Sequence, residues 1–284
     1  MTSIRLFKRA ASVRIGDLSL PNGFRMEFKV KKTLKGHPNT LDLTISNLSA
    51  QTRAALQTKG AKVTLLAGYE ENPDQLLFNG DARSIDHVRH GPTWLTRVQC
   101  GDGEAAMQSR TVSLSFGPGA KIGDVLLRLA QDAGLDLGNV SSRLKAGDVK
   151  GAAAQFLNGF AASGRAFPEL QNVARAAGLD VSVQDGALQA LVRGESTKEE
   201  AVLLSAETGL VDSPEHGTPE RSGEQAVLKL KSLLQPGIRP GRRIQLDAQF
   251  IKGSFVTETV THSGDTHGPP WYSEVECRPL GTVL

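Results

Sequence analysis

The chain has 284 residues, 39% of them hydrophobic, and its 33 basic and 30 acidic residues give a formal net charge of +3. This length suits two or three compact domains, and a charge this close to balance disfavours specific nucleic-acid binding, which needs a larger clustered excess of Lys and Arg. No run of about 18 apolar residues occurs, so no membrane span is expected, and no apolar signal segment follows the basic start, so export is not expected either.

The first hundred residues predict a small β-barrel with one short helix. From Phe24 to Val30 apolar and charged residues alternate with a period of two, as in a strand that buries one face. A helix is predicted after Ser49, which suits an N-cap, with its end at Gly60. Turns are predicted at three places, namely 36–39, 72–74 and 90–92. The same alternation recurs in LDLTI (41–45), KVTLLAGY (62–69) and TWLTRVQC (93–100).

The middle of the chain predicts a small α+β block. Apolar residues recur at helical spacing over 121–133 and again over 167–177, and each run ends in glycine. The segment 179–192 then predicts a β-hairpin, because its centre, Asp185-Gly186, suits a type I′ turn.

From about Arg193 the strand pattern returns. The segment RRIQLDAQF alternates and predicts a strand whose apolar face ends with Phe250. Residues 211–223 are rich in Pro and Gly and predict an exposed loop. Cys100 and Cys277 stand at the ends of strand-like segments and are expected to be reduced core thiols, with a disulfide left open. The other predicted strands are AVLLS, AVLKLKSLL, SFVTETVTH and WYSEVECRP.

These segments predict a mainly β protein with a smaller α+β part. Two β-barrel-like domains, at 1–106 and 194–284, flank a helix and hairpin domain at 107–193. The boundary near residue 107 stays open, because the segment TVSLSF at 111–116 could add a strand to the second barrel instead.

The order of the segments resembles the baseplate hub proteins of phage tails, the late-control-D-like family of contractile tails. The run KGAKVTLLAGYEENPDQLLFNGDARSI resembles the family's strand ending in Ala-Gly-Tyr, followed by a loop and a strand with Phe-x-Gly. SGRAFPELQNVARAAGLDVSVQDGALQAL resembles its helix and hairpin, and AVLLSAETGLVDSPE its return to the second barrel. KLKSLLQPGIRPGRRIQLDAQF and FVTETVTHSGDTHGPPWYSEVECRP resemble its closing strands. The resemblance rests on this order over most of the chain, since each motif alone is ordinary strand and turn chemistry.

The resemblance implies a virion structural protein. Each subunit would contribute two similar barrels, so that a homotrimer presents a pseudo-six-fold ring, a symmetry adaptor that joins the six-fold tail tube to the three-fold central spike. Expected partners are the tail tube or tube-initiator protein and the spike, with tape-measure and baseplate wedge proteins as further candidates. The expected location is the tail baseplate of a phage or related contractile injection system, after assembly in the host cytoplasm.

The strongest candidate site is His262, Asp265 and His267, because two imidazoles and a carboxylate within six residues could bind zinc or another divalent ion. The simpler interpretation is a hairpin turn in which Asp265 bonds nearby backbone amides. No further nitrogen or sulfur ligand stands at a recognisable spacing, so we favour the turn and expect neither metal nor cofactor. The histidines beside other predicted turns are expected at the surface: His37, His87, His90 and His216.

No activated nucleophile, carboxylate pair or nucleotide loop is recognisable, so the chain is not predicted to be an enzyme. The principal alternative is a tail-associated protein that binds or degrades the cell wall, suggested by the helix and hairpin block at 121–192. A nucleic-acid-binding barrel would need stacking aromatics on a basic face, whereas aromatic content is 5% and Phe24 and Phe28 stand on the apolar face.

Overall fold

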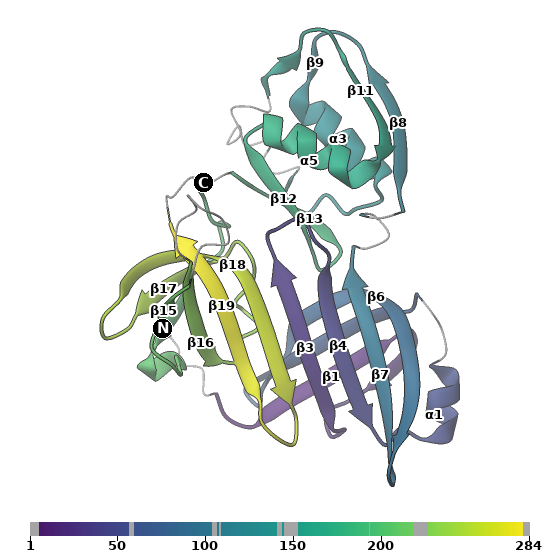
Figure 1. The fold of residues 1–284 in the computed structure, drawn as a ribbon, viewed down its shortest axis with the longest axis vertical. Coiled ribbons are helices and arrows are strands. Elements are labelled where there is room, and N and C mark those ends of the chain that lie inside the picture. The colour runs from purple at the N-terminus through teal and green to yellow at the C-terminus, as the bar shows by residue number, and fades with distance from the viewer. Residues whose placement is uncertain are drawn as a thin grey trace.

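The fold is mainly β, with two barrel-like blocks and a smaller α+β unit above them (Figure 1). The computed structural model describes residues 6–56, 60–103, 107, 109–140, 144, 153–192, 194–217 and 227–280. Buried hydrophobic residues form three clusters, one for each of the three blocks of the chain. The predicted fold class is therefore confirmed. In the described part of the chain no helix is long and apolar enough to cross a membrane.

The first barrel is built from seven strands and one helix. The period-two pattern predicted from Phe24 to Val30 is confirmed, because Met26, Phe28 and Val30 are buried while the residues between them are exposed. The helix is capped as predicted, with the Ser49 side chain accepting the Thr52 N–H. The elements are β1 (Arg9–Ile15), β2 (Leu18–Leu20), β3 (Met26–Thr33), β4 (Asn39–Ser46), α1 (Ala50–Ala55), β5 (Lys62–Tyr69), β6 (Asn72–His90) and β7 (Thr93–Asp102).

The second barrel uses the five strands predicted after residue 193 and one short addition inside the predicted loop. Arg193 itself and residues 218–223 of that loop lie outside the described residues. The elements are β14 (Val202–Ser205), the 3-10 helix η2 (Ala206–Thr208), β15 (Glu215–His216), β16 (Leu228–Leu233), β17 (Arg243–Asp247), β18 (Lys252–Asp265) and β19 (Trp271–Pro279).

One continuous sheet of thirteen strands runs through both barrels. The two blocks join where β3 pairs antiparallel with the second half of β18, from Thr259 opposite Thr33 to Asp265 opposite Glu27. Figure 1 shows β18 and β3 side by side at the middle of this sheet. Segments more than two hundred residues apart in the chain therefore form a single backbone ladder.

The middle unit packs two helices against short antiparallel strand pairs. Both predicted helices are present, with their apolar faces in one core. The predicted hairpin is also present, and the positive φ angles of Asp185 (55°) and Gly186 (88°) suit a type I′ turn. The elements are β8 (Thr111–Phe116), β9 (Ala120–Lys121), α3 (Ile122–Asp132), β10 (Gln155–Phe156), β11 (Phe160–Arg165), α5 (Ala166–Ala176), β12 (Leu179–Gln184) and β13 (Ala187–Val192).

Three local predictions are wrong, and one alternative that was left open is decided. The helix predicted to end at Gly60 ends at Ala55, with Leu56 as its C-cap. The turn expected at 72–74 lies instead at residues 70–71, and β6 begins at Asn72. Phe250 does not extend the apolar face of β17, because the strand ends at Asp247 and the Phe250 side chain is 84% exposed at the hairpin tip. The segment 111–116 adds no strand to the second barrel, since β8 pairs with β11 in the middle unit.

Candidate functional site

The two barrels repeat one order of strands. Neighbouring strands run β3-β4-β7-β6-β5-β1 in the first barrel and β15-β16-β19-β18-β17-β14 in the second. All of these pairings are antiparallel except that between β14 and β17, which is parallel. The equivalent long strands β6 and β18 each contain a bulge, at Arg83 and at Glu258, where the register shifts. The second barrel therefore repeats the strand order of the first, with the direction of its first strand reversed.

The last strand of each barrel carries the same sequence motif, which the strand-by-strand interpretation missed. HGPTWLTRVQC at 90–100 and HGPPWYSEVEC at 267–277 are identical at six of eleven positions, namely His, Gly, Pro, Trp, Val and Cys. The registers agree, because Cys100 lies opposite Ala82 and Cys277 opposite Thr257, each directly before its bulge. Both cysteines are buried and free. A comparison of the chain with itself would have found this repeat.

An equivalent glycine stands two residues before β5 and before β17, the strands that precede the long strands β6 and β18. Gly60 and Gly241 have φ angles of +81° and +83°. Their N–H groups donate to Ala82 O at 3.0 Å and to Thr257 O at 2.7 Å, respectively. A left-handed backbone is strained for residues with a Cβ, so both barrels need glycine at this entry into β5 and β17.

A histidine occupies the equivalent position in each long strand. Nδ1 of His87 lies 3.1 Å from Thr96 Oγ1, and Nδ1 of His262 lies 2.8 Å from Ser273 Oγ. Burial, together with the positive charge of Lys32, lowers the pKa of His262 to about 3, so this imidazole is neutral at physiological pH. The expectation that His87 is a surface residue is wrong, since its ring is half-buried between two partners.

The other two residues of the predicted site lie around the turn after β18. Asp265 is buried and its carboxylate accepts the His267 N–H at 2.8 Å and a hydrogen bond from Arg25 at 3.0 Å. The His267 side chain is exposed, with Nδ1 2.9 Å from Thr266 Oγ1. Because His262 and Asp265 are three residues apart on one strand, they project to opposite faces. Among the described residues no group of three or more His, Cys, Asp and Glu side chains is placed to hold a metal ion.

The two tryptophans of the repeated motif differ in their surroundings. Trp271 is 1% exposed and packs edge-on against Phe28 and Tyr69, with ring centroids 5.5 and 6.4 Å apart. A side chain of the second barrel thus fills part of the first barrel's core. Trp94 is only half-buried, and the Arg53 guanidinium lies 4.1 Å from its ring centroid.

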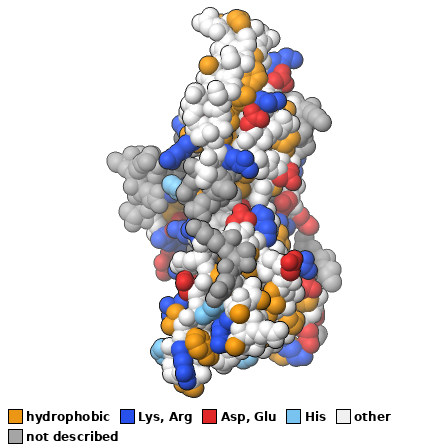
Figure 2. Space-filling model, turned by 90° about the vertical axis from the view of Figure 1, so that its right-hand side faces the viewer, with side chains coloured by type: hydrophobic (Ala, Val, Ile, Leu, Met, Phe, Trp, Pro, Cys, Tyr) orange, Lys and Arg blue, Asp and Glu red, His pale blue; other side chains and the backbone are white. Residues whose placement is uncertain are grey.

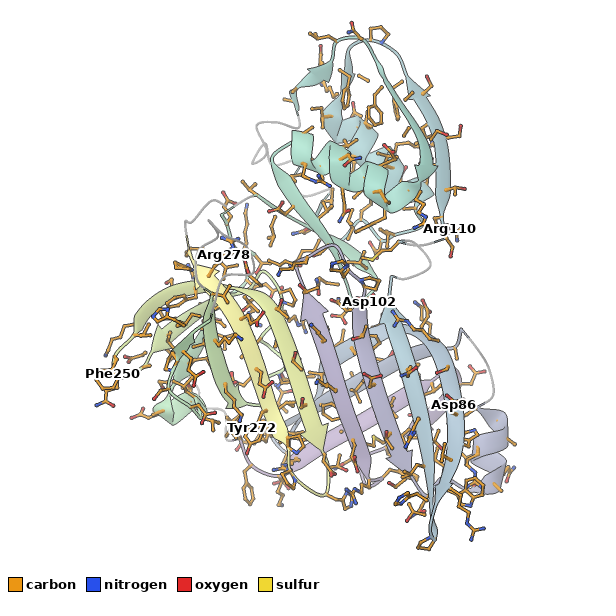
Figure 3. The ribbon with its side chains drawn as sticks, viewed as in Figure 1. Asp86, Asp102, Arg110, Phe250, Tyr272 and Arg278 are labelled. Carbon is orange, nitrogen blue, oxygen red and sulfur yellow. The ribbon has the colours of Figure 1, made fainter. Side chains whose placement is uncertain are left out.

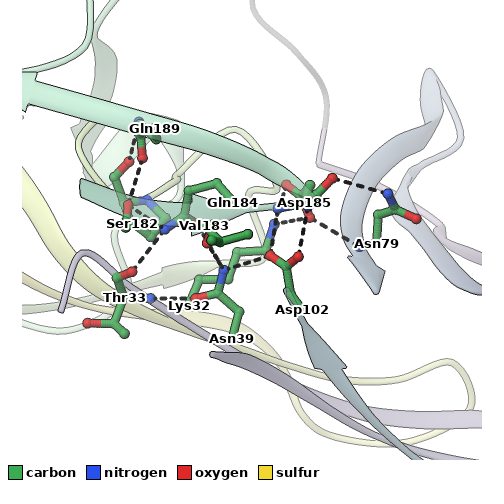
Figure 4. Close-up of polar contacts among 12 residues, drawn as sticks. Lys32, Thr33, Asn39, Asn79, Asp102, Ser182, Val183, Gln184, Asp185 and Gln189 are labelled. Carbon is green, nitrogen blue, oxygen red and sulfur yellow. Dashed lines mark hydrogen bonds and ion pairs between the residues drawn. The ribbon is translucent and has the colours of Figure 1, made fainter. Parts of the chain in front are cut away.

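The middle unit meets the first barrel through a buried carboxylate. Asp102, at the end of β7, is 0% exposed and accepts the N–H groups of Asp185 at 2.6 Å and Gly186 at 2.7 Å (Figure 4). The Asn39 side-chain amide donates to the same carboxylate at 3.0 Å. Burial raises the pKa of Asp102. The hairpin turn is therefore held by hydrogen bonds to the fully buried Asp102 carboxylate.

A buried ion pair completes this joint. Nζ of Lys32, 2% exposed, lies 2.7 Å from both carboxylate oxygens of Asp185. Burial lowers the pKa of Lys32, and the carboxylate of Asp185 opposes that shift. The backbone N–H of Asn79 also donates to Asp185, at 3.1 Å. The turn thus supplies partners for polar groups on β3, β6 and β7, and the preceding strand β12 supplies Val183 O to the Asn39 side chain on β4.

The second barrel contributes a weaker contact to the hairpin. The Gln189 side chain on β13 donates to Pro240 O at 3.3 Å. Figure 3 shows Asp102 directly below the hairpin, where the middle unit reaches the barrels. All three units therefore meet around residues 182–189.

The chain matches the protein family described as baseplate hub gp41 over residues 7–277. No curated protein matches it.

Several solved structures share the fold at low sequence identity. The 43 kDa tail protein of prophage MuSo2 from Shewanella oneidensis has a TM-score of 0.66 at 8% identity, over 96% of this chain and 99% of that one. The tail protein from Neisseria meningitidis MC58 has a TM-score of 0.64 at 12% identity, over 95% and 96% of the two chains. The E. coli c3393 protein, a component of the type VI secretion system, has a TM-score of 0.60 at 12% identity, over 96% and 79%.

Proposed function

The chain belongs to the baseplate hub gp41 family, and on that premise we propose that it forms a homotrimeric ring at the end of a tail tube. Membership makes it a structural protein of a tail baseplate, which agrees with the resemblance found in the sequence. Two tail proteins have a similar fold, which agrees with this family assignment.

The main observation in favour of the proposed ring is the strand order that the two barrels share. Two barrels of one topology in each chain give six comparable units from three copies. An assembly of three such chains can then meet a six-fold tube on one side and a three-fold spike on the other. We assign these barrels to residues 1–106 and 194–284, and the inserted unit to 107–193.

The outer face of the shared sheet suits the wall of a channel. On β3 the residues that alternate with the core are charged, and Glu27 and Lys29 are exposed. Neighbouring strands continue this face with Asp42 opposite Lys29 and with Glu274 opposite Lys231. The barrel cores lie behind it, so in a ring of barrels this mixed-charge face would line the lumen.

The proposed partners follow from the place of the ring. They are the tail tube or tube-initiator protein and the central spike, with tape-measure and wedge proteins as further contacts. The E. coli c3393 protein is described as structurally similar to the bacteriophage T4 tail proteins gp27 and gp5, which supports a position in a tail. Assembly would take place in the host cytoplasm before the protein reaches the virion baseplate.

We assign no catalytic or metal-binding role to His262, Asp265 and His267. The first two make internal hydrogen bonds that secure β18 and its turn. Replacing all three by Ala should change folding or assembly and leave no catalytic rate to lose. Stoichiometric zinc in the purified protein, released by these substitutions, would contradict this assignment.

The test of the ring is a mass measurement. Light scattering of the purified protein alone should give the mass of three chains, and the complex co-expressed with its tube and spike proteins should contain three copies of it. Zymograms against cell-wall material test the alternative of a wall-degrading enzyme. A protein that stays monomeric with every partner supplied would overturn the proposal.

A further inference from the structure

One segment of β6 has a strand on only one side. Before the bulge, residues 72–81 of β6 pair with β5, and after it Ser84–His90 pair with β7 alone. The equivalent segment of β18, Thr259–Asp265, has β19 on one side and β3 on the other. In the described part of the chain no strand occupies the outer edge of Ser84–His90.

A second free edge belongs to β15. This strand pairs with β16 through Glu215 opposite Lys229 and His216 opposite Leu228, and it ends the sheet on that side. Its equivalent in the first barrel is β3, which pairs with β4 in the same way but has β18 on its other side. Among the strands of the described residues, the edge pair β3 and β18 is used within the chain, and the equivalent pair, β15 and β6, has no partner on its outer edges.

We propose that the outer edge of β6 pairs with β15 of a second copy of this chain. The proposal rests on the ring proposed above, and it names the strands that hold the ring together. Each copy would offer β6 to one neighbour and β15 to the other, which is a head-to-tail contact that closes after a fixed number of copies. An exposed strand edge gains backbone hydrogen bonds when it accepts such a partner.

The internal pairing predicts the register between copies. In β18 and β3, Ser263 lies opposite Lys29. The repeat makes Val88 the equivalent of Ser263, because Val88 faces Leu95 as Ser263 faces Tyr272. Glu215 is likewise the equivalent of Lys29, through the pairs Asp42 with Lys29 and Lys229 with Glu215. Val88 should therefore lie opposite Glu215 of the next copy.

The side chains along the two edges suit this contact. Val88 is a large hydrophobic residue left 40% exposed, and the half-buried Trp94 lies on the other face of the same strand pair, opposite Arg89. In the internal junction the equivalent Trp271 packs into the neighbouring barrel, so Trp94 can do the same to the next copy. The β6 edge adds the basic Arg89 beside Val88, and Glu215 of β15 is acidic and exposed. Buried aromatics with complementary rim charges are typical of protein interfaces.

Figure 2 views the flank that carries α1 and β6, and it shows hydrophobic, basic and His side chains gathered at its lower end. Figure 3 places Asp86 of β6 on this flank, and Figure 1 places β15 on the opposite side, in the second barrel. The two free edges therefore belong to opposite halves of the molecule, as a head-to-tail ring requires.

The experiment is a disulfide across the predicted pair in the full chain. Directly opposed residues of antiparallel strands have Cα atoms about 4.5–5.5 Å apart, within the range of a disulfide. Val88→Cys combined with Glu215→Cys should give, after mild oxidation, a covalent trimer on a non-reducing gel that reductant returns to monomer. The native cysteines are buried and stay in all variants. The matched control is Val88→Cys with Asp212→Cys, which is three residues away, or roughly 10 Å along a strand.

Cross-linking only in the predicted pair supports the inference. A trimer by light scattering that shows no cross-link, or equal cross-linking in the control, overturns the inference and leaves the ring in place. A chain that is monomeric under all conditions overturns both. If the cysteine pair does not fold, Val88→Glu provides a second test, because like charges opposite one another repel, and it should raise the concentration for half-assembly by roughly tenfold. Adding Glu215→Lys should restore assembly, and a failure to do so counts against the register.

Discussion

The joint between the hairpin and the first barrel makes Asp102 the residue whose loss should cost most. Asp102→Ala removes the acceptor of two half-buried backbone donors, the amides of Asp185 and Gly186, and one of the three acceptors of the buried Asn39 side-chain amide. Each of the two backbone donors left without a partner costs about 1–3 kcal/mol, and relief from burying a carboxylate offsets part of that sum. We therefore expect a net loss of about 2–4 kcal/mol.

Urea unfolding followed by tryptophan fluorescence measures this loss, since Trp94 and Trp271 report on the barrels. Hydrogen exchange at the amides of Asp185 and Gly186 measures the joint itself, and both amides should exchange much faster in the variant. Asp74→Ala is the matched control, because this exposed aspartate near the start of β6 lies outside the proposed interface and should change stability by less than about 0.5 kcal/mol. An Asp102→Ala protein with unchanged unfolding free energy and unchanged amide protection would refute the reasoning.

Three further outcomes are expected. The pKa of His262 is lowered to about 3, so the folded protein keeps this imidazole neutral, and the stability that this contributes above pH 6.5 is lost as pH falls, at up to about 1.4 kcal/mol per pH unit. The unfolding free energy measured in urea should therefore fall between pH 7 and pH 5, and it should fall less steeply in His262→Gln. Gly60→Ala should cost about 1 kcal/mol in thermal or urea unfolding for its left-handed backbone, and Gly241→Ala clearly more, because its Cβ would lie 2.6 Å from a Leu191 methyl carbon, so equal losses would contradict the packing argument. Burial raises the pKa of Cys100 and of Cys277 to about 12, so a thiol reagent at pH 8 should label neither in the native protein and both after unfolding.

Local patterns predicted the elements well because each depends on neighbours in the sequence. Alternation in β3 and β4 has one buried face, and such a face shows directly as a period of two. The Asp185-Gly186 turn was predictable for the same reason, since two successive left-handed residues need Asn, Asp or Gly. Phe250 misled the interpretation because alternation continues past the end of the strand, where the hairpin turns into solvent.

The pairing of distant segments was not predictable from such patterns. Nothing in the sequence around Lys32 or Asp102 says that a turn more than eighty residues later lies against them. A buried lysine also looks like a surface residue in a strand pattern, because its partner, Asp185, belongs to another unit. The repeat at 90–100 and 267–277 was readable, however, and it would have identified His87 as a packed residue.

Because the two barrels of the chain are encoded separately, a single substitution changes only one of them. In an assembly of identical single-barrel chains, a substitution would appear in every barrel at once. Here each half has its own codons, and the two differ: the β6–β7 turn spans residues 91–92 whereas the β18–β19 turn spans 266–270. Selection can therefore alter one barrel while the surface of the other is kept, so the proposed three-copy ring would carry two independently evolving sets of contacts.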